Sequence, residues 1–240
     1  MIWLNCLGLR RIMYENLAYV PLDIPSVEFN LDDLADLFLN HGMNHYPYPH
    51  IWDAFCVCGR VEDWKNPIDT DRAWNERYIL DGDVPFNPHL PTALQIKLKF
   101  ILDRLPYKKY TFAQVLSQKI TVAPHQDGLY NPTENVKDAV YRGPGGFNNE
   151  PEPAGLKVML THKHAKCFYL SEKAGSARKF IRLPDDTNCF AINERTFFHG
   201  AKYLGEPKYI LSTFGIIDPE RHAEIIKRSL GKYYEYAIQF

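Results

Sequence analysis

Short apolar and β-branched segments, separated by turn-forming residues, run through the second half of this 240-residue chain. Turn sequences at Lys173-Ala-Gly-Ser, Pro184-Asp-Asp and Gly205-Glu-Pro separate several of these segments. Short strands at this spacing are typical of a β-sandwich or a barrel. Eight strands are predicted, at residues 110–115, 117–123, 125–127 with their flanks, 155–162, 165–171, 178–183, 187–192 together with 196–200, and 207–217.

Three helices are predicted outside these strands, at residues 31–40, 92–105 and 218–230. Each has an apolar stripe or a cap, such as Asn30 before the first helix and Pro219 in the last. Residues 1–109 are therefore predicted to form a helical and loop region that packs on a core at 110–240 and is not an independent domain. Residues 128–154, rich in Gly and Pro, form a long insertion that we interpret as a lid.

The composition of the chain argues against nucleic-acid-binding and membrane-spanning proteins. The 28 basic and 29 acidic residues give a net charge of −1, so stable binding to nucleic acid is not expected. No apolar run approaches the roughly 20 residues of a membrane span. The five cysteines favour reduced thiols and a cytoplasmic protein. Two arginines follow the apolar residues 1–9, which is the wrong order for a secretory signal, and Met13 is a candidate start. The oligomeric state stays open.

His125, Asp127 and His199 form the pattern that most constrains function. Alternate residues of a strand point to one face, so His125 and Asp127 project together while Gln126 points away. Two histidines and one carboxylate make the facial triad of non-haem Fe(II) oxygenases, which leaves open positions on the metal. A His-x-Asp pair is common by chance, and only together with the rest of the C-terminal half does it indicate a metal site. The further pair His162 and His164 lies in strand phase, has no third ligand, and is interpreted as surface.

The segment from Asn188 to Gly215 resembles the C-terminal part of the Fe(II)/2-oxoglutarate-dependent dioxygenases, and is most similar to their prolyl-hydroxylase-like branch. In that family a basic residue about nine positions after the distal histidine pairs with the far carboxylate of 2-oxoglutarate. Lys208 stands at this position here, and Ser212 is in phase with it on the same strand. Many family members have Arg where this chain has Lys208. The resemblance covers roughly residues 110–217 and implies a double-stranded β-helix, also called a jelly roll or cupin-like fold, with flanking helices.

The resemblance also implies the chemistry. Fe(II) would be held by His125, Asp127 and His199, and 2-oxoglutarate would be the co-substrate, with O2 as oxidant and ascorbate helpful. The products would be succinate, CO2 and a substrate hydroxylated at an unactivated C–H bond. The substrate would be a small metabolite, an amino acid or a peptidyl residue. Lys157 is a second candidate anchor for the co-substrate, with Thr161 as a hydroxyl donor, although an exposed strand lysine is the simpler interpretation.

Two other interpretations remain. One keeps the fold and the metal but is a cupin-like Zn or Mn protein that acts as a hydrolase, an isomerase or a binding module. The other is a non-catalytic β-sandwich that binds a partner. Lys208 in phase with Ser212, nine residues after His199, favours the oxygenase over both.

Overall fold

The structure is a computed structural model, and it describes residues 16–44, 50–59, 64, 84–126, 155–194 and 196–240. The predicted lid at 128–154 and the candidate start at Met13 lie outside these residues. None of the helices in the described ranges is long and apolar enough to cross a membrane.

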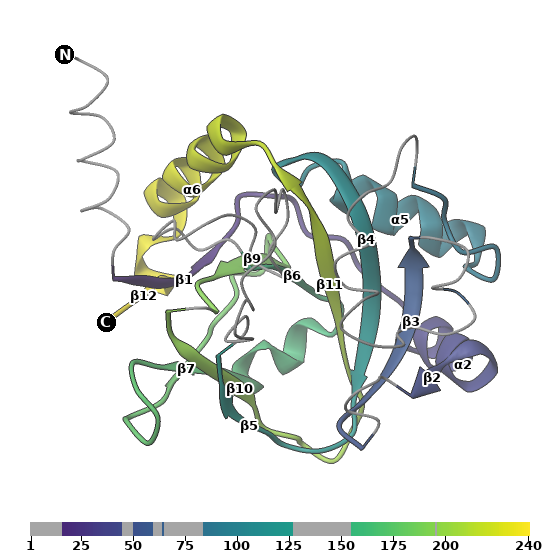
Figure 1. The fold of residues 1–240 in the computed structure, drawn as a ribbon, viewed down its shortest axis with the longest axis horizontal. Helices are drawn as coiled ribbons and strands as arrows, with labels where there is room; N and C mark the ends of the chain where they lie inside the picture. Colours follow the sequence, from purple (N-terminus) through teal and green to yellow (C-terminus); the bar gives the residue numbers. More distant parts are fainter. Residues whose placement is uncertain (1–15, 45–49, 60–63, 65–83, 127–154, 195) are drawn as a thin grey trace, which may run out of the picture.

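Two antiparallel sheets make up most of the fold (Figure 1). The large sheet has the order β12-β1-β9-β6-β11-β4-β3-β2, and the small sheet has the order β5-β10-β7-β8. The strands of the large sheet are β1 (Leu17–Pro21), β2 (Met43–Asn44), β3 (Trp52–Cys58), β4 (Tyr107–Gln118), β6 (Gly155–Met159), β9 (Cys189–Ile192), β11 (Lys208–Ile217) and β12 (Ile238–Gln239). The strands of the small sheet are β5 (Val122–His125), β7 (Phe168–Ser171), β8 (Lys179–Phe180) and β10 (Phe198–Ala201). The coarse prediction of a mainly β protein with flanking helices is confirmed.

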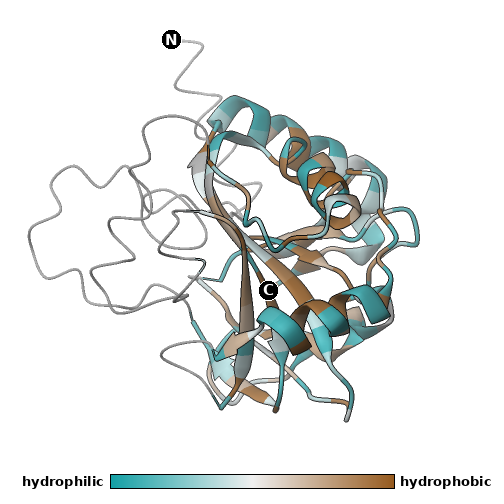
Figure 2. Ribbon diagram, turned by 90° about the vertical axis from the view of Figure 1, so that its right-hand side faces the viewer, coloured by the Kyte–Doolittle hydropathy of each residue, from teal (hydrophilic) through white to brown (hydrophobic). Residues whose placement is uncertain are grey.

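Three helices of the described residues cover the outer face of the large sheet, namely α2 (Leu31–His41), α5 (Thr92–Leu102) and α6 (Pro219–Tyr233). There are also two short 3-10 helices, η1 (His162–Cys167) and η2 (Tyr234–Tyr236), and Ala165 of η1 packs with Phe168 of β7 on the other side of the sheet. Buried helix residues such as Leu34, Leu98 and Ile225 share one core with Leu211 of β11. Figure 2 shows both hydrophilic and hydrophobic residues along these helices, as expected for elements that bury one side. All three predicted helices are confirmed, and Asn30 caps α2 by accepting a bond from the Asp32 amide at 2.9 Å.

A second core fills the space between the two sheets. Ile210 of β11 and Met159 of β6 meet Phe168 and Leu170 of β7 there. Because strand residues alternate between faces, the neighbours Tyr209 and Leu211 belong instead to the helix-side core. This alternation decides which side chains of β11 point into the sandwich.

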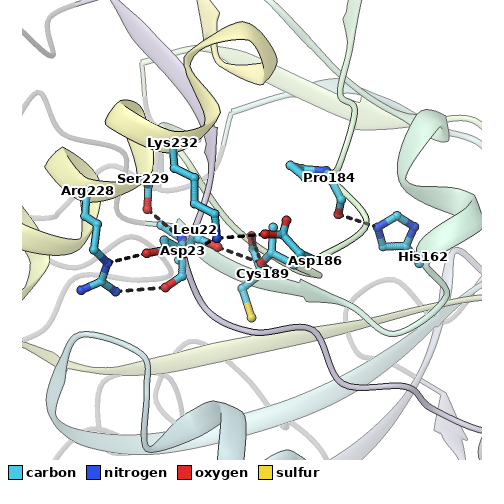
Figure 3. A network of polar contacts seen from close by, with 10 residues as sticks. Leu22, Asp23, His162, Pro184, Asp186, Cys189, Arg228, Ser229 and Lys232 are labelled. Carbon is cyan, nitrogen blue, oxygen red and sulfur yellow. Dashed lines mark hydrogen bonds and ion pairs between the residues drawn. The ribbon is translucent and has the colours of Figure 1, made fainter.

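The segment that follows β1 is tied to α6 by a polar network (Figure 3). The Asp23 carboxylate accepts bonds from Arg228 Nε at 2.6 Å and from Lys232 Nζ at 2.8 Å, and the Asp23 amide donates to Ser229 Oγ at 2.9 Å. Lys232 also pairs with Asp186 at 2.9 Å, so α6 is joined both to the segment after β1 and to the segment before β9. The Lys232 bond is the main cause that lowers the pKa of Asp23.

The N-terminal part contributes strands as well as helices. β1 pairs with β9 and β12, while β3 pairs with β4 and β2, so both are integral to the large sheet. The prediction of only helices and loops before residue 110 is wrong for these segments. β1 is buried along its whole length and β3 over its last five residues. Their sequences are continuously apolar in these buried parts and do not alternate with polar residues.

Several predicted strand boundaries are also wrong. Residues 110–115 and 117–123 are divided differently, since β4 continues unbroken to Gln118 and β5 begins at Val122. The combined strand at 187–192 and 196–200 is two strands, β9 and β10, in different sheets. The chain leaves β6 at Met159 and forms η1 before β7 starts at Phe168, so 155–162 and 165–171 are each strand only in part.

Candidate functional site

The two predicted histidine ligands face each other on neighbouring strands of the small sheet. His125 ends β5, and His199 is its direct partner in the register of β5 with β10. Their ring centroids are 4.2 Å apart with an interplanar angle of 48°. Two residues that lie 74 positions apart in the sequence are therefore brought together by strand pairing, as the sequence predicted.

The surroundings orient both imidazoles. Nδ1 of His125 lies 2.9 Å from the carbonyl oxygen of Ala123, and this contact requires that Nδ1 carries the proton. In the neutral ring Nε2 is then the nitrogen with a lone pair, which is the arrangement found in metal-binding histidines. His199 is buried, and its ring stacks on Phe168 of β7 at 5.8 Å and 15°. His199 thus faces the interior between the sheets, while His125 lies at the exposed rim.

The third predicted ligand, Asp127, lies outside the described residues. The described chain ends beside it at Gln126, whose Nε2 donates to the Thr196 carbonyl at 2.9 Å. This bond joins the end of β5 to the segment before β10. Within the described residues no group of three or more His, Cys, Asp or Glu side chains is arranged to hold a metal ion.

Lys208 is a buried cation at the start of β11. The residue is 3% exposed, and Nζ has no hydrogen-bond acceptor among the residues that the structure describes. The aromatic rings of Trp52 and Phe168 each lie 5.7 Å from Nζ. Burial lowers the pKa of Lys208 to about 7, and the nearby Cys167 opposes this effect only in part. A buried ammonium without an acceptor is costly, so this position favours an anionic ligand.

Phe168 connects Lys208 with the histidine pair, because its ring contacts both His199 and the Lys208 ammonium. Lys208 and His199 therefore line the same interior region between the sheets.

No protein-family model and no curated protein matches this chain.

Ser212 is buried on the same face of β11 as Lys208. It lies between Gln114 of β4 and Lys157 of β6 in the strand registers. Four residues of strand separate Ser212 from Lys208, which is about 13 Å between their α-carbons. They share a face, as predicted, but lie at different levels of the sandwich.

Lys157 and Thr161, the alternative anchor pair, already have partners. Lys157 is buried and pairs with Glu194 at 3.2 Å, so the interpretation of Lys157 as an exposed strand lysine is wrong. The Thr161 hydroxyl accepts a bond from the Tyr209 amide at 3.2 Å, and β6 ends before it, at Met159. Thr161 is thus not in strand phase with Lys157, because the chain has already left the sheet.

His162 and His164 belong to η1 and not to a strand. His164 is buried, with Nε2 2.6 Å from Oε1 of Glu206, so its interpretation as a surface residue is wrong. His162 Nε2 lies 3.1 Å from the Pro184 carbonyl oxygen.

Sequence reasoning missed two glutamines that face the same interior. Gln114 and Gln118 are each 2% exposed, and Oε1 of each has no hydrogen-bond donor among the described residues. Nε2 of Gln118 donates to the carbonyl oxygens of Ile120 at 2.7 Å and Ala201 at 3.1 Å. The sequence feature that could have identified them is their alternation with Phe112 and Leu116, which places all four residues on one face of β4.

Proposed function

We propose that this protein is a non-haem Fe(II)- and 2-oxoglutarate-dependent oxygenase that hydroxylates an unactivated C–H bond. The observation that carries the proposal is the combination of two facing histidines with a buried lysine that has no acceptor of its own among the described residues. The first element suits a transition metal, and the second suits the carboxylate of a co-substrate.

The order of strand pairing supports a double-stranded β-helix. Counting from β4, the first strand pairs with the eighth, β11, and the second, β5, pairs with the seventh, β10. The third, β6, pairs with the sixth, β9, and the fourth, β7, pairs with the fifth, β8. A long hairpin that is folded across two sheets produces this nested order, which is that of an eight-stranded jelly roll.

The residues present fit an iron centre in their donor chemistry. His125 and His199 would hold the metal through imidazole nitrogens, and Asp127 would supply the carboxylate two residues after His125. The Ala123 carbonyl oxygen fixes the ring of His125, and the stacked Phe168 ring fixes that of His199. When bound, the metal together with 2-oxoglutarate and O2 supplies the oxidising chemistry, with succinate and CO2 as co-products.

Lys208 would bind the far carboxylate of 2-oxoglutarate. A carboxylate beside Nζ favours the charged form, so binding reverses the effect that burial has on the pKa of this lysine. Because Trp52 and Phe168 flank Nζ, water is largely excluded and the ion pair is strengthened. Lys157 is the weaker candidate for this role, since Glu194 already neutralises it.

Succinate formation from 2-oxoglutarate tests the proposal. The wild-type protein, supplied with Fe(II), ascorbate and air, is expected to turn over slowly without added substrate, and Asp127→Ala is expected to lose this activity. Asp185→Ala, on an exposed turn, is the matched control. Lys208→Met should weaken Fe(II)-dependent binding of 2-oxoglutarate about 10-fold or more, because a charge-assisted hydrogen bond is lost. Lys227→Met on the exposed side of α6 should not weaken it.

Two results would overturn the proposal. One is undiminished turnover in Asp127→Ala, which would remove the triad. The other is the absence of any Fe(II)-dependent 2-oxoglutarate binding by the wild-type protein, which would favour a cupin-like Zn or Mn protein.

A further inference from the structure

Polar side chains on the inner face of the large sheet lie at two separate levels. At one level Lys208 of β11 is opposite Gln118 of β4, with Trp52 of β3 beyond it. At the other level Ser212 lies between Gln114 and Lys157. Between the two levels is an apolar row, in which Ile210 is flanked by Leu116 and Met159.

The histidine pair lies between these two levels. Residues 202–207 join the end of β10 to the start of β11, so Ala201 and Lys208 lie at the same end of the sandwich. The bond from Gln118 Nε2 to the Ala201 carbonyl oxygen confirms this, because Gln118 is opposite Lys208. His199 precedes Ala201 by two residues, about 7 Å of strand, whereas Ser212 follows Lys208 by four, about 13 Å. A ligand bound at the histidines therefore has Lys208 on one side and the Gln114 level on the other.

Gln114 is the unusual residue of that second level. It is 2% exposed, and Oε1 has no donor among the described residues. A buried amide oxygen that is left unbonded costs about 1–3 kcal/mol. The Ser212 hydroxyl is directly across from it in the register and is available from the neighbouring strand.

The charges at this level decide which ligand chemistry fits. Lys157 is the cation beside Ser212, and Glu194 compensates it at 3.2 Å. The row thus offers an amide and a hydroxyl without uncompensated charge. Such a row matches a neutral group that both donates and accepts hydrogen bonds, whereas the charge of a carboxylate or an ammonium would meet no unpaired counter-charge among the described residues of the row.

We propose that Gln114 and Ser212 form the contact for the prime substrate and recognise a neutral amide, either a peptide bond or a side-chain carboxamide. This inference rests on the proposed function, because only an oxygenase would have a prime substrate at this position. It assigns Ser212 to the substrate side of the metal and leaves Lys208 as the anchor for the co-substrate. The substrate class is then peptidyl or carboxamide-bearing, and not an acidic metabolite.

Titration of the protein with N-methylacetamide, followed by nuclear magnetic resonance, tests the inference. The sample is the 15N-labelled full chain loaded with Zn(II), as a diamagnetic replacement for iron, and with 2-oxoglutarate. Saturable shifts are expected for the Gln114 side-chain NH2, identified by its absence in Gln114→Met, and for the Ser212 backbone amide. Gln114→Met should weaken the effect at Ser212 about 5-fold or more, since one buried hydrogen bond is worth roughly 1 kcal/mol. Ser212→Ala should weaken the effect at the Gln114 NH2.

Matched controls separate recognition from nonspecific effects. Gln239→Met makes the same substitution on an exposed side chain of β12 and should titrate like the wild type. Acetate and methylammonium, which resemble the two halves of the probe but carry charge, should leave the Gln114 signal in place. A linear response that never saturates, equal titration of Gln114→Met and wild type, or equal shifts with acetate would each overturn the inference.

A separate measurement distinguishes failure of the Gln114 and Ser212 assignment from failure of the proposed oxygenase function. The visible absorption band of an Fe(II)–2-oxoglutarate complex in the wild-type protein reports the co-substrate site alone. A band without a saturable amide shift rejects the Gln114 assignment and keeps the oxygenase. An amide shift without a band keeps the Gln114 site and rejects the oxygenase.

Discussion

Replacing Lys208 by methionine should stabilise the protein when no ligand is bound. Lys208 is 3% exposed and Nζ has no acceptor among the described residues, so the folded state carries the cost of a buried charge. Burial lowers the pKa from 10.5 to about 7. Since each pKa unit corresponds to about 1.4 kcal/mol, the cost of charging Lys208 in the folded state has an upper limit of about 5 kcal/mol. Methionine has a similar length and packs well in irregular apolar spaces.

The pH dependence of this effect follows from proton binding. Between about pH 7 and 10.5 the unfolded chain keeps the Lys208 proton and the folded chain releases it, so wild-type stability rises with pH in this window. Below about pH 7 both states are protonated and the full cost remains. The advantage of Lys208→Met should therefore be several kcal/mol at about pH 6, and it should shrink steadily toward about pH 10.

Urea unfolding of the metal-free proteins measures the difference at each pH. Comparison with the wild type cancels the other titrating groups, because both proteins contain them. Lys227→Met, on the exposed side of α6, should show no such trend. If Lys208→Met is less stable than wild type at about pH 6, or if the difference is constant with pH, Nζ has a partner and the reasoning about its burial is wrong.

Three other predictions concern the same sheets and their anchors. Above about pH 7, Lys208 should take up a proton when 2-oxoglutarate binds to the Mn(II)-loaded protein. Calorimetry in buffers of different ionisation enthalpy should then give different binding heats. A binding heat that is the same in all buffers would contradict the proton uptake. Gly200→Ala should destabilise the fold by about 1–3 kcal/mol and weaken metal binding, because its new Cβ would lie 2.4 Å from Oη of Tyr169 and 2.7 Å from the Val122 carbonyl oxygen. Gly231→Ala meets nothing within 4 Å and should be neutral or stabilising, so equal effects of the two in urea unfolding would refute the packing argument. Asp23→Asn should cost about 1 kcal/mol near neutral pH by removing the bonds to Arg228 and Lys232. Because the pKa of Asp23 is lowered in the folded state, this cost should vanish as the pH falls through that pKa, and thermal unfolding at about pH 7 and about pH 3 would show whether it does.

The parts of the fold with a clear periodicity could be predicted from the sequence. The apolar stripe of α2 and its cap at Asn30 are local signals, and the structure has both. β1 and β3 have no comparable signal, because strands buried on both faces lose the alternation of polar and apolar residues. Their position inside the large sheet depends on β9 and β4, which are far away in the sequence. That information is tertiary and is not available from a local pattern.

The site shows the same division between local and tertiary information. The expectation that His199 lies on a strand beside His125 came from the strand pattern, and the structure pairs the two residues. The role of Lys208 is implied only by the resemblance to the dioxygenases, through its offset from His199, and stays a prediction. The partner of Lys157 could not be predicted in this way, since Glu194 reaches it from beyond the end of another strand. Equally, strand phase places Ser212 and Lys208 on one face without showing that they lie at different levels.

The distance between those levels constrains where a co-substrate and a substrate can bind. An anchor for the co-substrate must lie on one side of the metal, and the substrate must approach from another, or the two would compete for one space. The roles proposed for Lys208 and Gln114 meet this requirement, because the apolar row at Ile210 separates the two residues on a single sheet face. Among the described residues Nζ of Lys208 has no acceptor, which favours an anion on its side, and Oε1 of Gln114 has no donor, which favours a neutral hydrogen-bonding group on the other side. The inner face of the large sheet thus has two polar positions of different character, one on each side of the facing histidines.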